Sequence, residues 1–229
     1  MLKDGQKGSI SQRDKVTYAI APHLPCGVVT PATLRKLADV AEKYNCAAVK
    51  VTSAARIALV GLKEEDIDAA WDELGMETGA AVGLCVRSVK ACPGTTFCKV
   101  GQQDSLGVGM KLDAKYHGME LPGKLKIGVS GCMNQCAETS IKDVGLVGKK
   151  KGWIVLVGGT GGAKPRLAEQ LAEGLTTDQA LEVVDKILDF YRQNANKRER
   201  LWKMLERVGI DAFRSAVLPD SQGAAQGAD

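Results

Sequence analysis

Four of the seven cysteines form the pattern that most constrains this chain. Cys92 and Cys98 form one pair and Cys132 and Cys136 a second, and the full spacing is C-x5-C-x33-C-x3-C. Each pair sits in a run of loop-forming residues, ACPGTTFC and SGCMNQC, and not in an apolar stretch. Four thiolates on two such loops can surround one metal centre, and a [4Fe–4S] cluster accepts wide ligand spacings. The pattern therefore predicts an iron–sulfur cluster.

Two other interpretations of the four cysteines stay open. Zinc is bound by four thiolates, although its usual spacings are tighter, C-x2–4-C. Free cysteines are also common as small buried hydrophobic residues. Of the remaining three, Cys46 and Cys85 are expected to be packing residues, whereas Cys26 lies in a loop close to a helix start. The odd total argues against a disulfide framework.

Composition narrows the class of protein further. With 229 residues, 45% of them apolar, the chain is long enough for one large or two small globular domains. No apolar run approaches the ~20 residues that cross a membrane, and the polar N-terminus lacks a secretory signal. A cytoplasmic location with no membrane partner is expected. A net charge of +4 with only 4% aromatic residues suits a small anionic ligand better than nucleic acid.

Hydrophobic periodicity divides the chain into two parts. Over residues 1–90 the order is strand, helix, strand, strand, helix, strand, which is the split βαβ arrangement of a ferredoxin-like half-domain. Thr30 followed by Pro31 marks the start of the first helix. The predicted strands are 15–21, 47–52, 56–60 and 83–89, and the predicted helices are 31–44 and 64–74.

Residues 91–219 are predicted to form an α/β domain that carries the cysteines. Together the two parts define an α+β protein. The last residues, 220–229, are polar and glycine-rich and are expected to be disordered. The predicted strands of this part are 124–129, 144–147 and 153–157. The cysteine-bearing loop ACPGTTFCKVGQQDS is expected to lead into a helix, and the other predicted helices are 165–173, 177–194, 197–208 and 211–217.

Several motifs together resemble one family. C-x5-C followed by G-C-x-N-x-C resembles the signature of the sirohaem-dependent sulfite and nitrite reductases. Four further segments agree, so the resemblance covers roughly residues 15–217. They are HLPCGVVT, KVTSAARIALVGL, DVGLVGKKKGWIVLVGGTGG and LERVGIDAFR. The chain has one copy of a unit that larger members contain twice, as in the small, single-unit, assimilatory-type sulfite reductases, and it would act as a monomer or a homodimer.

The resemblance implies an enzyme, its cofactors and their ligands. Cys92, Cys98, Cys132 and Cys136 would hold a [4Fe–4S] cluster, Cys136 would also bind the sirohaem iron, and Asn134 would contact a cofactor. The implied reaction is the six-electron reduction of sulfite to sulfide, with electrons from a separate donor protein. Nitrite reduction to ammonia is an alternative within the family. An iron–sulfur electron-transfer protein without haem is an alternative of another class.

Cationic residues near the cysteines are candidates for binding the anionic substrate. Lys124 and Lys126 stand two apart on a predicted strand, so their side chains share one side. A solvated strand face explains them equally well, but K-x-K after Leu-Pro resembles the family's substrate-lysine segment. The family also places a substrate or sirohaem arginine near Arg87, with Lys90 as a competitor. Its sirohaem-carboxylate contacts fall at Lys50 and Arg56.

Two segments depart from the motifs that they resemble. His23 and Cys26 stand where the family has arginine and glycine, so no role is assigned to that loop. The segment VGGTGGAKP fails both the G-x-x-x-x-G-K-[ST] and the G-x-G-x-x-G nucleotide motifs. A glycine turn before a helix still offers backbone N–H groups to an anion. We expect Gly158, Gly159, Lys164 and Arg166 to bind sirohaem carboxylates, with a plain tight turn as the alternative.

Overall fold

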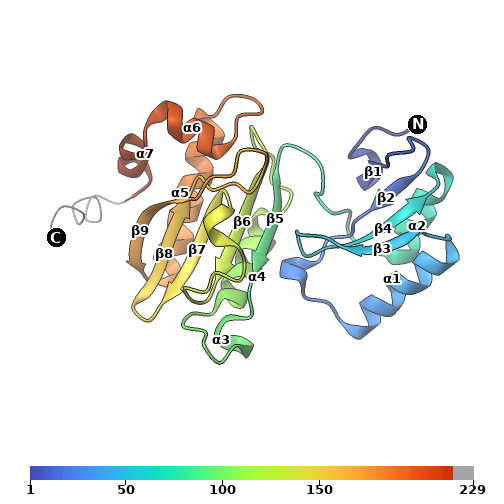
Figure 1. Cartoon of the computed structure of the whole chain (residues 1–229), viewed down its shortest axis with the longest axis horizontal. Helices are drawn as coiled ribbons and strands as arrows, with labels where there is room; N and C mark the ends of the chain where they lie inside the picture. The colour runs from blue at the N-terminus through green and yellow to red at the C-terminus, as the bar shows by residue number, and fades with distance from the viewer. Residues whose placement is uncertain (219–229) are drawn as a thin grey trace. The chain divides into compact units, whose positions relative to one another are not determined.

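The computed structural model describes residues 1–218 and divides the chain into two compact units (Figure 1). The first unit is Met1–Gly83, and the second begins at Leu84. The expected tail, residues 220–229, lies outside the described residues. Within residues 1–218, every helix is too short or too polar to cross a membrane.

The first unit is an antiparallel sheet with two helices packed on it. The strand order is β1-β2-β4-β3. Thr30 caps the first helix by accepting a hydrogen bond from the Thr33 backbone N–H at 3.1 Å, and Pro31 is its first residue, as predicted. The elements are β1 (Ser9–Ser11), β2 (Tyr18–Ile20), α1 (Pro31–Lys43), β3 (Ala48–Val51), β4 (Ile57–Leu62) and α2 (Ile67–Leu74).

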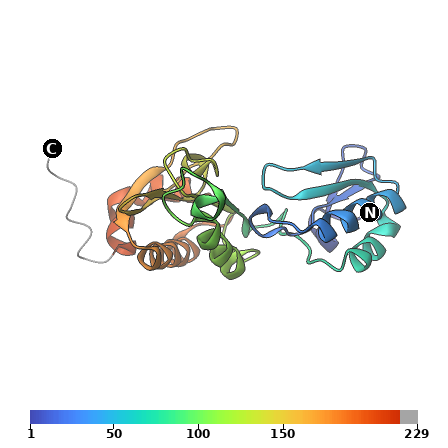
Figure 2. The same cartoon turned by 90° about the horizontal axis from the view of Figure 1, so that it is seen from below.

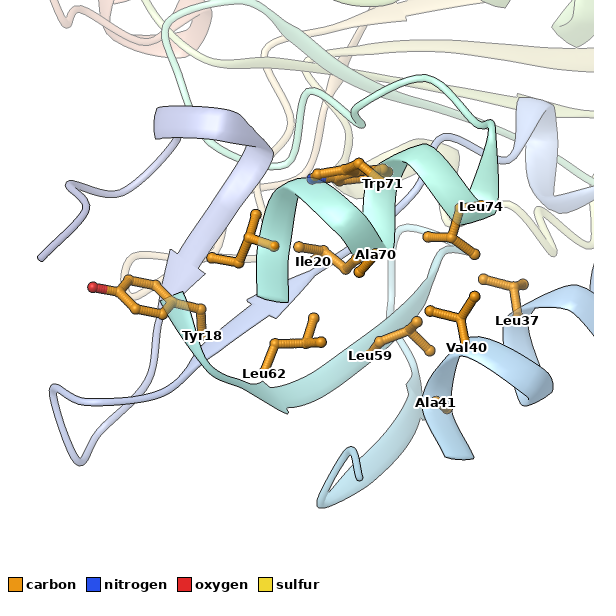
Figure 3. Close-up of a cluster of buried hydrophobic side chains, with 11 residues drawn as sticks. Tyr18, Ile20, Leu37, Val40, Ala41, Leu59, Leu62, Ala70, Trp71 and Leu74 are labelled. Atoms are coloured by element: carbon orange, nitrogen blue, oxygen red, sulfur yellow. The ribbon is translucent and has the colours of Figure 1, made fainter. Parts of the chain in front are cut away.

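One hydrophobic core joins β2, β4, α1 and α2 (Figure 3). Leu37 and Val40 of α1 and Trp71 of α2 lie over Ile20 and Leu59 of the sheet. Cys46 packs against this cluster from its edge, which agrees with its expected packing role.

The predicted strand 83–89 does not complete the first sheet. β5 (Val86–Ala91) instead pairs in parallel with β6 (Leu125–Ser130) in the second unit. The fourth strand of the first sheet is β1, which is only three residues long and shows no clear strand pattern in the sequence. Packing decides the assignment, since Val86 and Val89 are buried beside Leu125 and Ile127.

The second unit is a five-stranded mixed sheet in the order β5-β6-β7-β8-β9. β5, β6 and β7 are parallel, whereas β8 and β9 are antiparallel to their neighbours. The helices α4 and α5 lie on one face of this sheet (Figure 2). The remaining elements are α3 (Gly94–Phe97), α4 (Ser105–Tyr116), β7 (Val144–Lys149), β8 (Gly152–Val157), β9 (Glu169–Leu175), α5 (Thr177–Asn194), α6 (Leu201–Val208) and α7 (Ile210–Val217).

The connection from β6 to β7 crosses the sheet on the face opposite α4. Parallel neighbours always need such a crossover, and here it is the cysteine loop, residues 131–143. It lies flat because Gly128 and Gly145 have no side chains. A Cβ on Gly128 would meet the Ala137 carbonyl oxygen at 3.1 Å, and one on Gly145 would meet the Thr139 carbonyl oxygen at 2.7 Å.

The helix predicted at 165–173 is wrong, because this segment forms the edge strand β9. Its buried residues are Leu171, Ala172 and Leu175, a spacing that imitates one face of a helix. Two register irregularities between β8 and β9 produce that spacing. Pairing with β8 therefore overrides the local pattern, and the glycine-rich turn does not lead into a helix.

Candidate iron–sulfur and anion site

The two cysteine loops meet at the carboxyl edge of β5 and β6. Ala91 and Val129 are paired residues of the parallel strands, so the loops that carry Cys92 and Cys132 begin side by side. The Gly131 backbone N–H donates to the Cys92 Sγ at 3.1 Å. This edge of parallel strands is the usual ligand-binding edge of an α/β sheet.

Glycines let the loops approach closely. A Cβ on Gly131 would lie 2.8 Å from the Gly94 Cα, and Gly94 has a φ of +56°. The Gln103 backbone N–H donates to the Gly131 carbonyl oxygen at 3.0 Å. The glycines of CPG and SGC therefore join the two halves of the cysteine pattern.

The donor set fits an iron–sulfur cluster. All four cysteines are free and at least partly exposed, and Cys136 is the most exposed of the four. The Cys92 Sγ also contacts the Ser105 hydroxyl at 3.1 Å, and hydrogen bonds to sulfur are typical of cluster ligands. Within residues 1–218, no group of three or more His, Cys, Asp or Glu side chains is arranged to hold a metal ion. Cluster thiolates bind four different iron atoms and stand further apart than the ligands of one ion.

The segment around Cys136 is anchored to the sheet. The Ala137 backbone N–H donates to the Ser130 hydroxyl at 3.0 Å. The Gln135 Oε1 accepts from the Thr139 hydroxyl at 2.6 Å and from the Ser140 backbone N–H at 3.0 Å. Asn134, a predicted cofactor contact, is exposed in the same loop.

The lysine pair lies on the strand that leads to Cys132. Lys124 is exposed just before β6, and Lys126 is partly buried within it. Burial lowers the pKa of Lys126, and the positive charges of Lys142, Arg200 and Lys124 lower it further, while Asp143 opposes them. The Lys126 ammonium group thus lies in a positive environment that suits an anion.

Arg87 occupies an irregular position in β5. The register of β5 against β6 shifts between Val86 and Ser88, so Arg87 is the extra residue. A bulge of this kind re-aims a side chain and is common beside active sites.

Glu138 and Lys142 follow Cys136 closely in the sequence and were not assigned roles, and Lys90 was only a competitor of Arg87. The Glu138 carboxylate binds the Lys90 Nζ at 2.8 Å and the Lys142 Nζ at 2.7 Å. Hydrogen bonds from Lys142 and then Lys90 lower the pKa of Glu138 to about 2. Glu138 and Lys142 have opposite charges and are four residues apart, a spacing that brings side chains together in a helix. In a loop the same spacing predicts no contact.

A buried ion pair supports the start of β7. Arg200 donates to both carboxylate oxygens of Asp143, at 2.7 and 2.9 Å. Asp143 is 1% exposed and also accepts from the Lys126 backbone N–H at 2.9 Å. The pair connects the segment before α6 to the lysine strand.

The glycine-rich turn is a closed loop between two strands. Thr160 and Arg166 exchange two backbone hydrogen bonds at 2.9 Å. Gly158 has a φ of +81°, and a Cβ on Gly159 would lie 2.6 Å from the Lys142 carbonyl oxygen. Lys164 is exposed, whereas Arg166 forms ion pairs with Glu169 and Glu206. The turn is therefore not followed by the predicted helix, and it packs closely against Lys142 of the cysteine crossover.

Two predicted residues belong to the first unit. Lys50 is exposed on β3 and donates to the Val51 carbonyl oxygen at 2.6 Å. Arg56 is 5% exposed, and its backbone N–H donates to the Thr52 hydroxyl at 3.1 Å. Cys26 and Cys85 are buried.

Two domain families match the chain. Residues 10–77 match the nitrite/sulfite reductase ferredoxin-like half domain, and residues 82–223 match the nitrite and sulphite reductase 4Fe-4S domain. The chain belongs to the nitrite and sulphite reductase family, which confirms the resemblance and the predicted fold class.

Similar proteins include sulfite reductases and nitrite reductases. The assimilatory-type sulfite reductase of Nitratidesulfovibrio vulgaris is 49% identical over 95% of this chain and 100% of its own length. The nitrite reductase [NAD(P)H] of Bacillus subtilis is 42% identical over 88% of this chain, which spans only 25% of that protein. The Escherichia coli nitrite reductase (NADH) large subunit is 36% identical, with the same 25% spanned.

Solved structures share the fold. Dissimilatory sulfite reductase I superposes with a TM-score of 0.78 at 14% identity, covering 93% of this chain and 72% of that one. The NirA protein of Mycobacterium tuberculosis superposes with a TM-score of 0.76 at 20% identity, covering 95% and 43%.

Proposed function

We propose that this chain is a sulfite reductase of the assimilatory type, which reduces sulfite to sulfide with six electrons. The observation that carries the proposal is the meeting of two cysteine loops beside a lysine-bearing face of the same sheet. The substrate is inferred from the relative that this chain matches over its whole length, a sulfite reductase. When bound, sirohaem and a [4Fe–4S] cluster would supply the iron site and the electron relay.

The chain's own residues would hold these groups. Cys92, Cys98, Cys132 and Cys136 are the proposed cluster ligands, and Cys136 would also bind the sirohaem iron. Sirohaem is rich in carboxylates, so several cations and backbone N–H groups would be needed to bind it. The proposed contacts are Lys50, Arg56, Asn134, Gly158, Gly159, Lys164 and Arg166.

Arg87, Lys124 and Lys126 are the proposed substrate residues. Their positive charges would bind and orient the oxyanion, and protonated lysines could deliver protons as oxygen leaves as water. Arg166 would serve as a sirohaem contact only after leaving Glu169 and Glu206, which makes Lys164 the simpler partner.

The electrons would come from a separate donor protein. A cytoplasmic location is proposed. Because the chain contains a single copy of the reductase unit, we propose that it acts as a monomer or a homodimer.

Nitrite reduction is the second candidate, because nitrite reductases reach 42% identity. The two are separated by steady-state kcat/KM for sulfite and for nitrite, with one chemical electron donor and the cofactor-loaded enzyme. We expect sulfite to be preferred and sulfide to be the product. A preference for nitrite with ammonia as product would overturn the assignment, and turnover of neither would favour an electron carrier.

A further inference from the structure

Glu138 links two lysines beside the last cysteine of the pattern. Its two carboxylate oxygens contact different ammonium groups, those of Lys90 and Lys142. The side chains of these lysines are 22% and 10% exposed, whereas that of Glu138 is 45% exposed. One carboxylate therefore fixes two largely buried positive charges.

Hydrogen bonds constrain the backbone at Glu138 and at the residue before it. Glu138 has a φ of +58°, in the left-handed region, and its backbone N–H donates to the Gln135 carbonyl oxygen at 2.8 Å. The preceding residue is tied to β6 through Ser130. A side chain on so constrained a backbone is suited to orienting its partners.

Gly128 is the point around which three lysines gather. Lys90 is its paired residue on β5, so both share one face. A Cβ on Gly128 would lie 2.8 Å from the Lys142 Cγ, so the stem of Lys142 crosses this glycine. Lys126 precedes Gly128 by two residues and shares the same face.

The charges of this face do not cancel. Glu138 binds two of the lysines, and Asp143 is bound by Arg200. Among the described residues, Lys126 forms no ion pair. The face around Gly128 therefore keeps an excess positive charge.

We propose that Glu138 is a positioning residue that holds Lys90 and Lys142 beside Lys126, so that the three ammonium groups bind one oxyanion. The inference rests on the proposed function, and the oxyanion is either sulfite or a sirohaem carboxylate. The competing possibility is that the Glu138 carboxylate only occupies the anion's place. The two possibilities predict opposite changes in anion affinity when Glu138 is replaced. Removing a competitor tightens anion binding, whereas removing a positioning group weakens it.

The test is Glu138→Gln in the cofactor-loaded enzyme. Three quantities are measured: the KM for sulfite, the Kd of phosphate as an unreactive oxyanion by calorimetry, and the sirohaem content per chain. If sulfite is the ligand, KM and Kd rise about 3-fold to 10-fold while sirohaem content is unchanged. If a sirohaem carboxylate is the ligand, sirohaem content falls by a similar factor. Unchanged values, or tighter phosphate binding with full sirohaem content, would overturn the proposal.

A double-mutant comparison separates positioning from general damage. In a Lys90→Gln/Lys142→Gln background, Glu138→Gln should add no further effect, because it acts through these lysines. Additive losses would contradict this. Glu182→Gln, which breaks the exposed Glu182–Lys186 pair on α5, is the matched control and should behave as wild type. A wild-type enzyme without sirohaem or sulfite turnover would instead refute the proposed function.

Discussion

At the residue scale, the chemistry depends on charges whose partners the sequence does not reveal. Cysteine spacing predicted four metal ligands, because each pair lies in a run of loop-forming residues and not in an apolar stretch. The same reasoning could not place Glu138 or Lys142, whose contacts depend on how the crossover lies on the sheet. Lys90 was considered only as a competitor of Arg87. The bulge at Arg87 adds one residue to β5, and this extra residue determines the face on which each following side chain lies.

Lys126 should give a pH signature. The charged ammonium form binds an oxyanion and is lost as pH rises through the pKa, which burial and neighbouring cations hold below the ordinary value of 10.5. The KM for sulfite should therefore increase with pH within the alkaline range below that value. Lys126→Arg keeps its charge there, and its KM should not increase in this way. The same pH profile in both enzymes would contradict this role for Lys126.

The Arg200–Asp143 pair should be important for stability. Replacing Arg200 with Leu leaves a carboxylate that is 1% exposed without its main partner, and this should lower the free energy of unfolding by about 3–5 kcal/mol. Urea unfolding followed by circular dichroism measures the change. Arg192→Leu, which breaks the exposed Arg192–Asp189 pair, should cost only about 0–1 kcal/mol. Equal losses in both variants would argue against the buried pair's importance.

At the element scale, most helices and strands were predictable from period and capping, and the failures have physical causes. β1 is short. β5 belongs to the second sheet and not the first, because its valines pack with β6. In β9, two register irregularities give the buried residues a helix-like spacing. The β5 and β9 failures involve pairing with segments outside the local pattern, whereas β1 is missed because it is only three residues long. Local patterns cannot report such pairing, because ladder partners are chosen by burial in the completed sheet.

The cysteine crossover should be sensitive to side chains beneath it. Gly145→Ala places a methyl group 2.7 Å from the Thr139 carbonyl oxygen, so the crossover must lift from β7. We expect a loss of about 1–3 kcal/mol in stability and a lower content of iron and acid-labile sulfide per chain. Chemical iron and sulfide analysis beside thermal unfolding measures both. Wild-type values for stability and for metal content would show that the crossover does not depend on this close contact.

At the scale of the whole molecule, the sequence predicted a ferredoxin-like half followed by a cysteine-bearing α/β part. The two matched domain families correspond to these parts, at residues 10–77 and 82–223. The sequence did not predict the face of the second unit that we propose binds an anion. That face is produced by Gly128 and Gly145, which let a loop carrying Cys136 and Glu138 lie against the sheet.

The most direct test of the account is the optical and EPR spectrum of the anaerobically purified protein, produced with an adequate supply of sirohaem. Iron and acid-labile sulfide are counted on the same sample. The account predicts sirohaem absorption bands together with cluster signals, and more iron than sulfide because of the haem iron. Cluster signals without tetrapyrrole bands, with equal iron and sulfide, would contradict it and identify an electron carrier.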